Sequence, residues 1–219
     1  MKRAAYVFDL DGTLVNSVPG ICRGLNLALE KLGYPTHSEQ AVAQMVGRGA
    51  LELCRSALSE HFHGSVPSAA LDELHAGFAR EYPQTWQSGT VPYEGIELVL
   101  QSLVERGIPI GILSNKPHEV TVPLVKEIFP HIPFRCVMGF SDCYPRKPDP
   151  SALLAIAAEW GLSPAEVCMV GDSAHDGNTA VNAGTDLVLV GWGYSNRPAL
   201  EAFGVPICET MQQLISELS

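Results

Sequence analysis

Residues 4–13 read AAYVFDLDGT, a short apolar run interrupted and closed by aspartates, a glycine and a threonine. The apolar run over 4–10 is typical of a buried strand in a parallel sheet, and Asp11-Gly12 predicts a turn directly after it. In an open parallel sheet, ligands bind outside the carboxyl ends of the strands. The stretch therefore predicts the first strand of an α/β fold, with Asp9 and Asp11 at the edge where chemistry takes place.

The periodicity of apolar residues changes along the chain. From about residue 17 to residue 88 the pattern is helical, in three sets: Ile21 to Leu32, Leu51 to Leu58, and Leu71 to Tyr82. After Pro92, strand and helix patterns alternate, which implies a parallel sheet with helices on both faces. We expect an α/β core domain made of residues 1–15 and 90–219, with an all-helical domain, residues 16–89, inserted after the first strand.

The elements expected after Pro92 can be stated by residue range. Strands are expected at 108–113, 135–138, 167–170 and 186–190, and helices near 95–106, 118–128, 151–160, 176–183 and 197–203. The tail predicts a short strand over 205–208 and a last helix over 211–218.

Composition and charge exclude several classes of protein. Fourteen Lys and Arg against 24 Asp and Glu give a net charge of -10, which argues against a broad basic surface for nucleic acid or membrane. The six cysteines show neither CxxC nor zinc-ligand spacing, as in reduced intracellular proteins. No stretch is long and apolar enough for a signal sequence or membrane span. We expect a cytoplasmic monomer or homodimer.

Polar residues gather at the predicted strand ends. Asp9 and Asp11 follow the first strand, and Ser114-Asn115-Lys116 follow the next. Lys147 lies in a later loop, and residues 171–176 read GDSAHD. Carboxylates crowded at one edge repel each other unless a cation joins them, and Mg²⁺ prefers such oxygen ligands. With Mg²⁺ and Lys147 in place, the edge would attract an anion and suit phosphoryl transfer.

Each of these residues can be given a chemical role. Asp9 is the candidate nucleophile, because a carboxylate can attack phosphorus and form an acyl phosphate. Asp11 would protonate the leaving oxygen and later deprotonate water. Ser114 and Lys147 complete the catalytic set, Ser114 by holding phosphoryl oxygens with the backbone N–H groups after it, and Lys147 by neutralising charge.

Two further sets are predicted around this catalytic group. Metal ligands are expected to be Asp9, Asp11, Asp172 and Asp176. Residues that contact the substrate are expected to be Gly12, Ser114, Asn115 and Arg48. Arg48 lies between two glycines of the inserted domain, from which it could reach a substrate carboxylate or second phosphate.

Four segments in order resemble the motifs of the haloacid dehalogenase superfamily: DLDGT at 9–13, Ser114-Asn115, Lys147-Pro148 and GDSAHD at 171–176. The resemblance spans the chain, and the helical insertion resembles the first type of cap in that family. It implies a Rossmann-like core, Mg²⁺ dependence and an aspartyl-phosphate intermediate on Asp9. Members that break carbon–halogen bonds lack an acid/base aspartate two residues after the nucleophile, so Asp11 indicates a phosphate ester substrate.

Within the superfamily, SNKP at 114–117 and GRG at 47–49 resemble the phosphoglycolate phosphatase-like members. His175 and Gly177 depart from the pattern, since Asn and an aliphatic residue are common there. We therefore expect a Mg²⁺-dependent phosphatase acting on a small phosphorylated metabolite, with 2-phosphoglycolate first. The alternatives are a phosphomutase or related phosphotransferase, a pyrophosphatase or nucleotidase, and a non-catalytic phosphate sensor.

Overall fold

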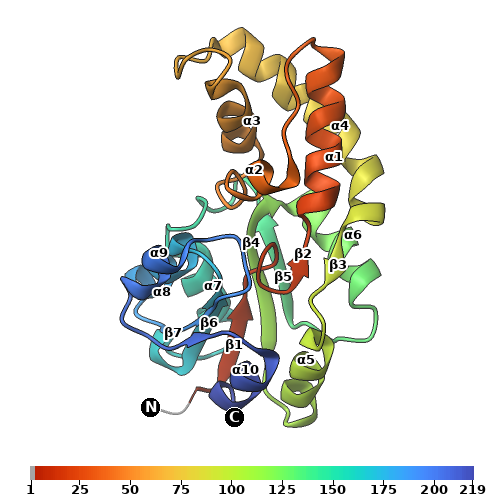
Figure 1. The fold of residues 1–219 in the computed structure, drawn as a ribbon. Coiled ribbons are helices and arrows are strands. Elements are labelled where there is room, and N and C mark those ends of the chain that lie inside the picture. The colour runs from red at the N-terminus through yellow and green to blue at the C-terminus, as the bar shows by residue number, and fades with distance from the viewer. Residues whose placement is uncertain (1–2) are drawn as a thin grey trace. The chain divides into compact units, whose positions relative to one another are not determined.

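The computed structural model describes residues 3–219, and the chain divides into two units (Figure 1). The first unit combines the described residues up to Val15 with residues 92–219, and the second is Asn16–Val91. The chain passes between the units at two short strands, β2 (Val15–Asn16) and β3 (Val91–Pro92). The expected insertion, 16–89, ends two residues before the second unit does.

The first unit is built on a six-stranded sheet in the order β5-β4-β1-β6-β7-β8, and every neighbouring pair is parallel. Its strands are β1 (Ala5–Phe8), β4 (Ile110–Pro117), β5 (Cys136–Phe140), β6 (Val167–Gly171), β7 (Asp186–Val190) and β8 (Ile207–Cys208). All the expected strands are present. Strands β1 and β8 are shorter than their expected ranges, 4–10 and 205–208, and β4 continues past its expected end at residue 113, with a register irregularity between Leu113 and Pro117.

Helices cover both faces of this sheet, as the alternating pattern predicts. They are α5 (Ile96–Glu105), α6 (His118–Ile128), α7 (Ser151–Glu159), α8 (Ala174–Ala183), α9 (Arg197–Glu201) and α10 (Met211–Glu217), with a 3₁₀ turn at Pro164–Glu166. Successive side chains of a strand point to opposite faces. Ala5 and Val7 accordingly join a core cluster with residues of α7, α8 and α9, whereas the Tyr6 hydroxyl donates a hydrogen bond to Leu218 O beyond α10.

The second unit is helical: α1 (Val18–Lys31), α2 (Glu39–Ala43), α3 (Ala50–Ser59) and α4 (Ser68–Gly89). Helix α4 continues through Pro83, past the periodic set that ends at Tyr82. Helices α1 and α4 approach closely, since a Cβ on Gly89 would overlap the backbone of Gly20. Among residues 3–219, no helix combines the length and hydropathy needed to cross a membrane.

Candidate active site

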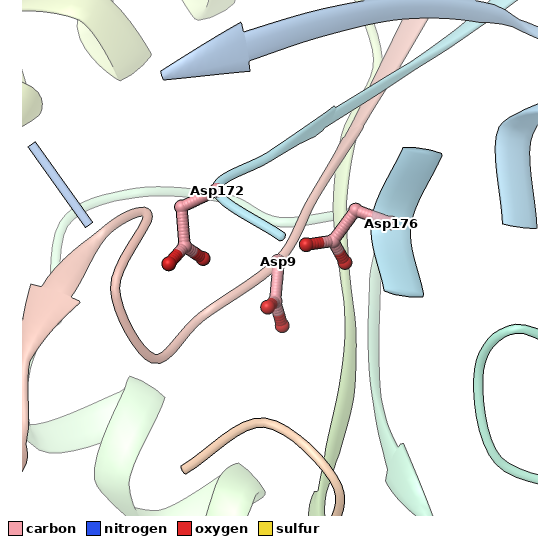
Figure 2. A group of neighbouring side chains, drawn as sticks. All are labelled: Asp9, Asp172 and Asp176. Carbon is pink, nitrogen blue, oxygen red and sulfur yellow. The ribbon is translucent and has the colours of Figure 1, made fainter. Parts of the chain in front are cut away.

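Three buried carboxylates meet at the carboxyl ends of β1 and β6 (Figure 2). Asp9 follows β1, Asp172 follows β6, and Asp176 lies in the first turn of α8. One oxygen of each lies within 4.8 Å of the others, and Asp176 is fully buried. The register explains the meeting, because Phe8 pairs with Val170 and the two parallel strands therefore end side by side. Asp11, although predicted as a metal ligand, does not contribute its carboxylate to this group.

Lys147 is the cation of the group. Its Nζ lies 2.8 Å from Asp9 Oδ1 and 2.6 Å from Asp176 Oδ1, and its side chain is 3% exposed. Burial by itself lowers the pKa of Lys147, but the carboxylates of Asp176 and Asp9 outweigh burial and raise that pKa above its usual value. Lys147 therefore stays protonated and neutralises part of the acidic charge.

The charge of Lys147 does not neutralise the three carboxylates of Asp9, Asp172 and Asp176 completely. Burial, together with the charge of Asp176, raises the pKa of Asp9 to about 7 in spite of Lys147. Burial and the charges of Asp176 and Asp9 raise the pKa of Asp172 well above its usual range. Three ionised carboxylates and one ammonium group carry a net charge of -2. This all-oxygen donor set fits a hard divalent cation such as Mg²⁺.

Backbone and hydroxyl groups hold Asp172 in place. Thr13 Oγ1 donates a hydrogen bond of 3.1 Å to Asp172 Oδ1, and the Tyr194 N–H donates one of 2.8 Å to Oδ2. Gly12 has a left-handed φ of 88°, and a Cβ there would overlap the Asp172 carboxylate. Gly193 approaches the same carboxylate as closely. Sequence reasoning assigned no role to Thr13, although it lies in the DLDGT segment, and Tyr194 carries no local signal.

Asp176 divides its two oxygens between two tasks. Oδ2 accepts hydrogen bonds from the Ser173 backbone N–H at 3.0 Å and from Ser173 Oγ at 2.6 Å, which caps α8. Oδ1 pairs with Lys147. The helix cap thus fixes the carboxylate that in turn positions the lysine.

Residues 114–116 lie at the end of β4, and each makes a different contact. Ser114 Oγ accepts a hydrogen bond of 3.2 Å from the Lys116 N–H. The Asn115 side chain donates to Lys147 O at 3.1 Å and accepts from Lys147 N at 2.8 Å, so it anchors the lysine loop. Lys116 Nζ forms an ion pair with Asp11, at 2.8 Å from Oδ2.

The predicted site residues therefore fall into two groups. Those of the first unit are gathered at one edge of the sheet: Asp9, Asp11, Gly12, Ser114, Asn115, Lys147, Asp172 and Asp176. Arg48 belongs to the second unit, where it is exposed between Gly47 and Gly49, both with left-handed φ. Its contact with substrate stays a prediction.

The chain is similar in sequence to a known family of hydrolases. The model of the haloacid dehalogenase-like hydrolase family matches residues 6–190, a range that contains both lysines and all the aspartates of the site. A phosphoglycolate phosphatase of Pseudomonas savastanoi is 33% identical over 211 residues, which cover 95% of this chain and 77% of the relative. The phosphoglycolate phosphatase of Yersinia pestis is 33% identical over 194 residues, covering 88% and 83%.

Solved structures share the whole architecture. A crystal structure of a phosphoglycolate phosphatase candidate from Lactobacillus delbrueckii subsp. bulgaricus is 26% identical, with a TM-score of 0.92 over 100% of this chain and 99% of that one. The similarity extends over the sheet and the inserted helices.

Proposed function

The chain belongs to the haloacid dehalogenase-like hydrolases and is a phosphoric monoester hydrolase, and from this premise we propose a Mg²⁺-dependent phosphatase that works through an aspartyl-phosphate on Asp9. The observation that carries the proposal is a buried Asp9 in contact with Lys147, inside a group of three carboxylates. The proposed substrate is a small metabolite with a phosphate ester, and 2-phosphoglycolate is the first candidate because similar proteins are named phosphoglycolate phosphatases.

Asp9, Asp172 and Asp176 are the residues that would hold Mg²⁺. Bound there, the ion supplies positive charge to the phosphoryl oxygens. The raised pKa values of Asp9 and Asp172 support this assignment, because a divalent cation is what three buried carboxylates and a single lysine require to be ionised together.

In the first half of the proposed reaction, an Asp9 oxygen bonds to phosphorus and the ester bond breaks. The leaving alcohol oxygen takes a proton from Asp11. Lys147 neutralises the developing charge on the phosphoryl group, and Ser114 orients that group together with nearby backbone N–H groups. In the second half, water attacks the acyl phosphate, Asp11 accepts a water proton, and inorganic phosphate leaves.

Phosphate release from a panel of compounds tests the proposal, with Mg²⁺ and then with EDTA. The panel contains 2-phosphoglycolate, sugar phosphates, nucleoside monophosphates and pyrophosphate. We expect release only with the metal, and fastest with 2-phosphoglycolate. Mass spectrometry of acid-quenched enzyme should then find a phosphoryl group on the peptide that contains Asp9.

Three outcomes would contradict parts of the proposal. Isomerisation of a sugar phosphate that needs a bisphosphate activator and releases no phosphate would indicate a mutase. Faster release from pyrophosphate or nucleoside monophosphates would change the substrate class. A folded protein that binds Mg²⁺ and phosphate but turns over nothing would indicate a sensor.

A further inference from the structure

The site contains a second buried lysine that the mechanism above does not use. Lys116 Nζ lies 2.8 Å from Asp11 Oδ2 and 3.0 Å from Oδ1, so one ammonium group contacts both oxygens of the carboxylate. The side chain of Lys116 is 4% exposed and that of Asp11 is 11% exposed. Lys147, by contrast, contacts Asp9 and Asp176. The two lysines therefore serve different carboxylates.

The backbone around Lys116 is fixed from both sides. Its N–H donates to Ser114 Oγ, and its carbonyl accepts a hydrogen bond of 3.2 Å from Thr121 Oγ1 in α6. The side chain thus extends from a rigid strand end toward a residue 105 positions earlier in the chain. A buried ion pair adds little net stability, because desolvation of both charges offsets their attraction. Stability alone therefore does not account for this pair.

We propose that Lys116 is a positioning residue that orients the Asp11 carboxylate for the second half of the reaction. This inference rests on the proposed function. Two contacts from one ammonium group restrict rotation of the carboxylate, and catalysis by a base depends on its orientation. Asp11 held in this way is arranged to accept a proton from the water that hydrolyses the aspartyl-phosphate.

The step balances without any further reactant. The water oxygen bonds to phosphorus, and the bond between phosphorus and the Asp9 oxygen breaks with its electron pair returning to Asp9. The water proton moves to Asp11, and inorganic phosphate departs. In the next turnover this proton passes from Asp11 to the leaving alcohol.

Rapid mixing with p-nitrophenyl phosphate and Mg²⁺ separates the two halves of the reaction. Nitrophenolate leaves without needing a proton, so the first half does not depend on Asp11. In Lys116→Met we expect a burst of nitrophenolate close to the enzyme concentration, then a steady-state rate about 10- to 100-fold below that of the wild type. Asp11→Asn should show the same pattern, and the double variant should be no more than about 3-fold slower than Asp11→Asn alone.

Two matched variants complete the design. Lys126→Met removes an exposed lysine from α6 and should leave both phases unchanged. Lys116→Arg keeps a cation beside Asp11 and should recover part of the steady-state rate. Thermal unfolding is measured for each, and if Lys116→Met does not fold, Lys116→Gln is read in the same way.

Several results would overturn the proposal. A raised KM with unchanged kcat would make Lys116 a substrate ligand, and a slowed burst would place it in the first half. Effects of Lys116→Met and Asp11→Asn that multiply would mean that the two residues act independently. An unchanged burst and steady-state rate would also refute the role. Failure of the wild type to release phosphate with Mg²⁺ from every phosphate ester of the panel, and nitrophenolate from p-nitrophenyl phosphate, would instead refute the proposed function itself.

Discussion

The two units of the chain bury different kinds of side chain. Among the described residues, every buried charged side chain lies in the first unit: Asp9, Lys116, Lys147, Asp172 and Asp176. The buried polar residues of the second unit are Ser17, Thr85 and Thr90, and the charged side chains described there are exposed or half-buried. Helices α1 and α4 instead pack through glycines such as Gly20 and Gly24.

This difference suggests that the first unit holds the chemically active side chains and that the second is held together by apolar packing. Because charges are costly to bury without partners, their concentration at one sheet edge indicates a site rather than a core. Substitutions in the first unit should therefore affect turnover, and those in the second should affect stability or choice of substrate. Four experiments test that division, in order of decreasing effect.

The nucleophile provides the largest expected effect. Asp9→Asn should lower phosphate release by about 10³-fold or more, because the attacking oxygen is lost. The melting temperature should stay unchanged or rise, since the substitution removes a buried charge that Asp176 repels. Phosphate release and thermal unfolding are measured together. A folded Asp9→Asn enzyme with wild-type activity would refute the nucleophile assignment.

A substitution in the packing of the second unit should have the opposite effect, lowering stability and leaving activity nearly unchanged. Gly89→Ala places a Cβ against the Gly20 backbone, which cannot move aside as a flexible side chain can, so we expect a loss of about 1–3 kcal/mol in unfolding free energy. Activity on p-nitrophenyl phosphate at low temperature should change little. In the matched variant Gly77→Ala, the new Cβ would lie 3.2 Å from Ala28 Cβ, and stability should change by less than about 1 kcal/mol. Equal losses in both variants would contradict the packing account.

The carboxylate group predicts how stability of the metal-free protein depends on pH. The pKa of Asp9 is raised in the folded state to about 7, so between its unfolded pKa of about 4 and pH 7 the folded state binds more protons. Stability should fall as pH rises through this window, because the folded state loses a proton that the unfolded state has already lost. Added Mg²⁺ should stabilise the protein more at pH 8 than at pH 5.

Denaturant unfolding in EDTA and in Mg²⁺ measures this dependence. Asp9→Asn serves as the control, because it removes one of the two carboxyl groups whose pKa is raised and should make the curve less steep, while Asp172 remains. A metal-free protein that gains stability between pH 5 and pH 8 relative to Asp9→Asn would contradict the prediction.

Arg48 should give the smallest effect. If it binds a second anionic group of the substrate, Arg48→Ala should raise KM for 2-phosphoglycolate by about 3- to 10-fold, as for loss of one exposed charge contact. KM for p-nitrophenyl phosphate, which has no such group, should not change. Arg55→Ala, which removes another exposed arginine of the second unit, is the control. Equal KM values in the wild type and in Arg48→Ala would remove Arg48 from the substrate-binding residues.

Sequence reasoning could predict the sheet and the edge of the site because both follow from local patterns. Apolar runs and helical periodicity identify strands and long helices, and parallel topology brings strand ends together. The short helix α2 (Glu39–Ala43) was not predicted, because five residues hold too few apolar positions to show a helical period. The end of α4 was not predicted either, because a proline such as Pro83 usually marks the boundary of a helix.

The contact of Lys147 with the nucleophile Asp9 was expected, but the other pairings between distant side chains could not be predicted. The contact of Lys116 with Asp11 depends on the irregular end of β4, where side-chain direction no longer follows simple alternation. The nitrogen and the oxygen of the Asn115 side-chain amide both bond to the Lys147 backbone, which the sequence does not indicate, and contact of Asn115 with substrate stays a prediction. Neither direction nor bonding partner is encoded in the spacing of the motifs.

One hydrogen bond has a consequence for how this protein family can diversify. The chain leaves the first unit after residue 15 and returns to it at residue 92. The Tyr93 N–H donates a hydrogen bond of 3.1 Å to Leu14 O, which joins the two segments of the first unit next to these points. Because the two ends of the insertion lie next to each other, the inserted segment can change in length or sequence without changing the sheet. We therefore expect that residues 16–91 can be exchanged for the corresponding segment of a relative without disturbing the sheet.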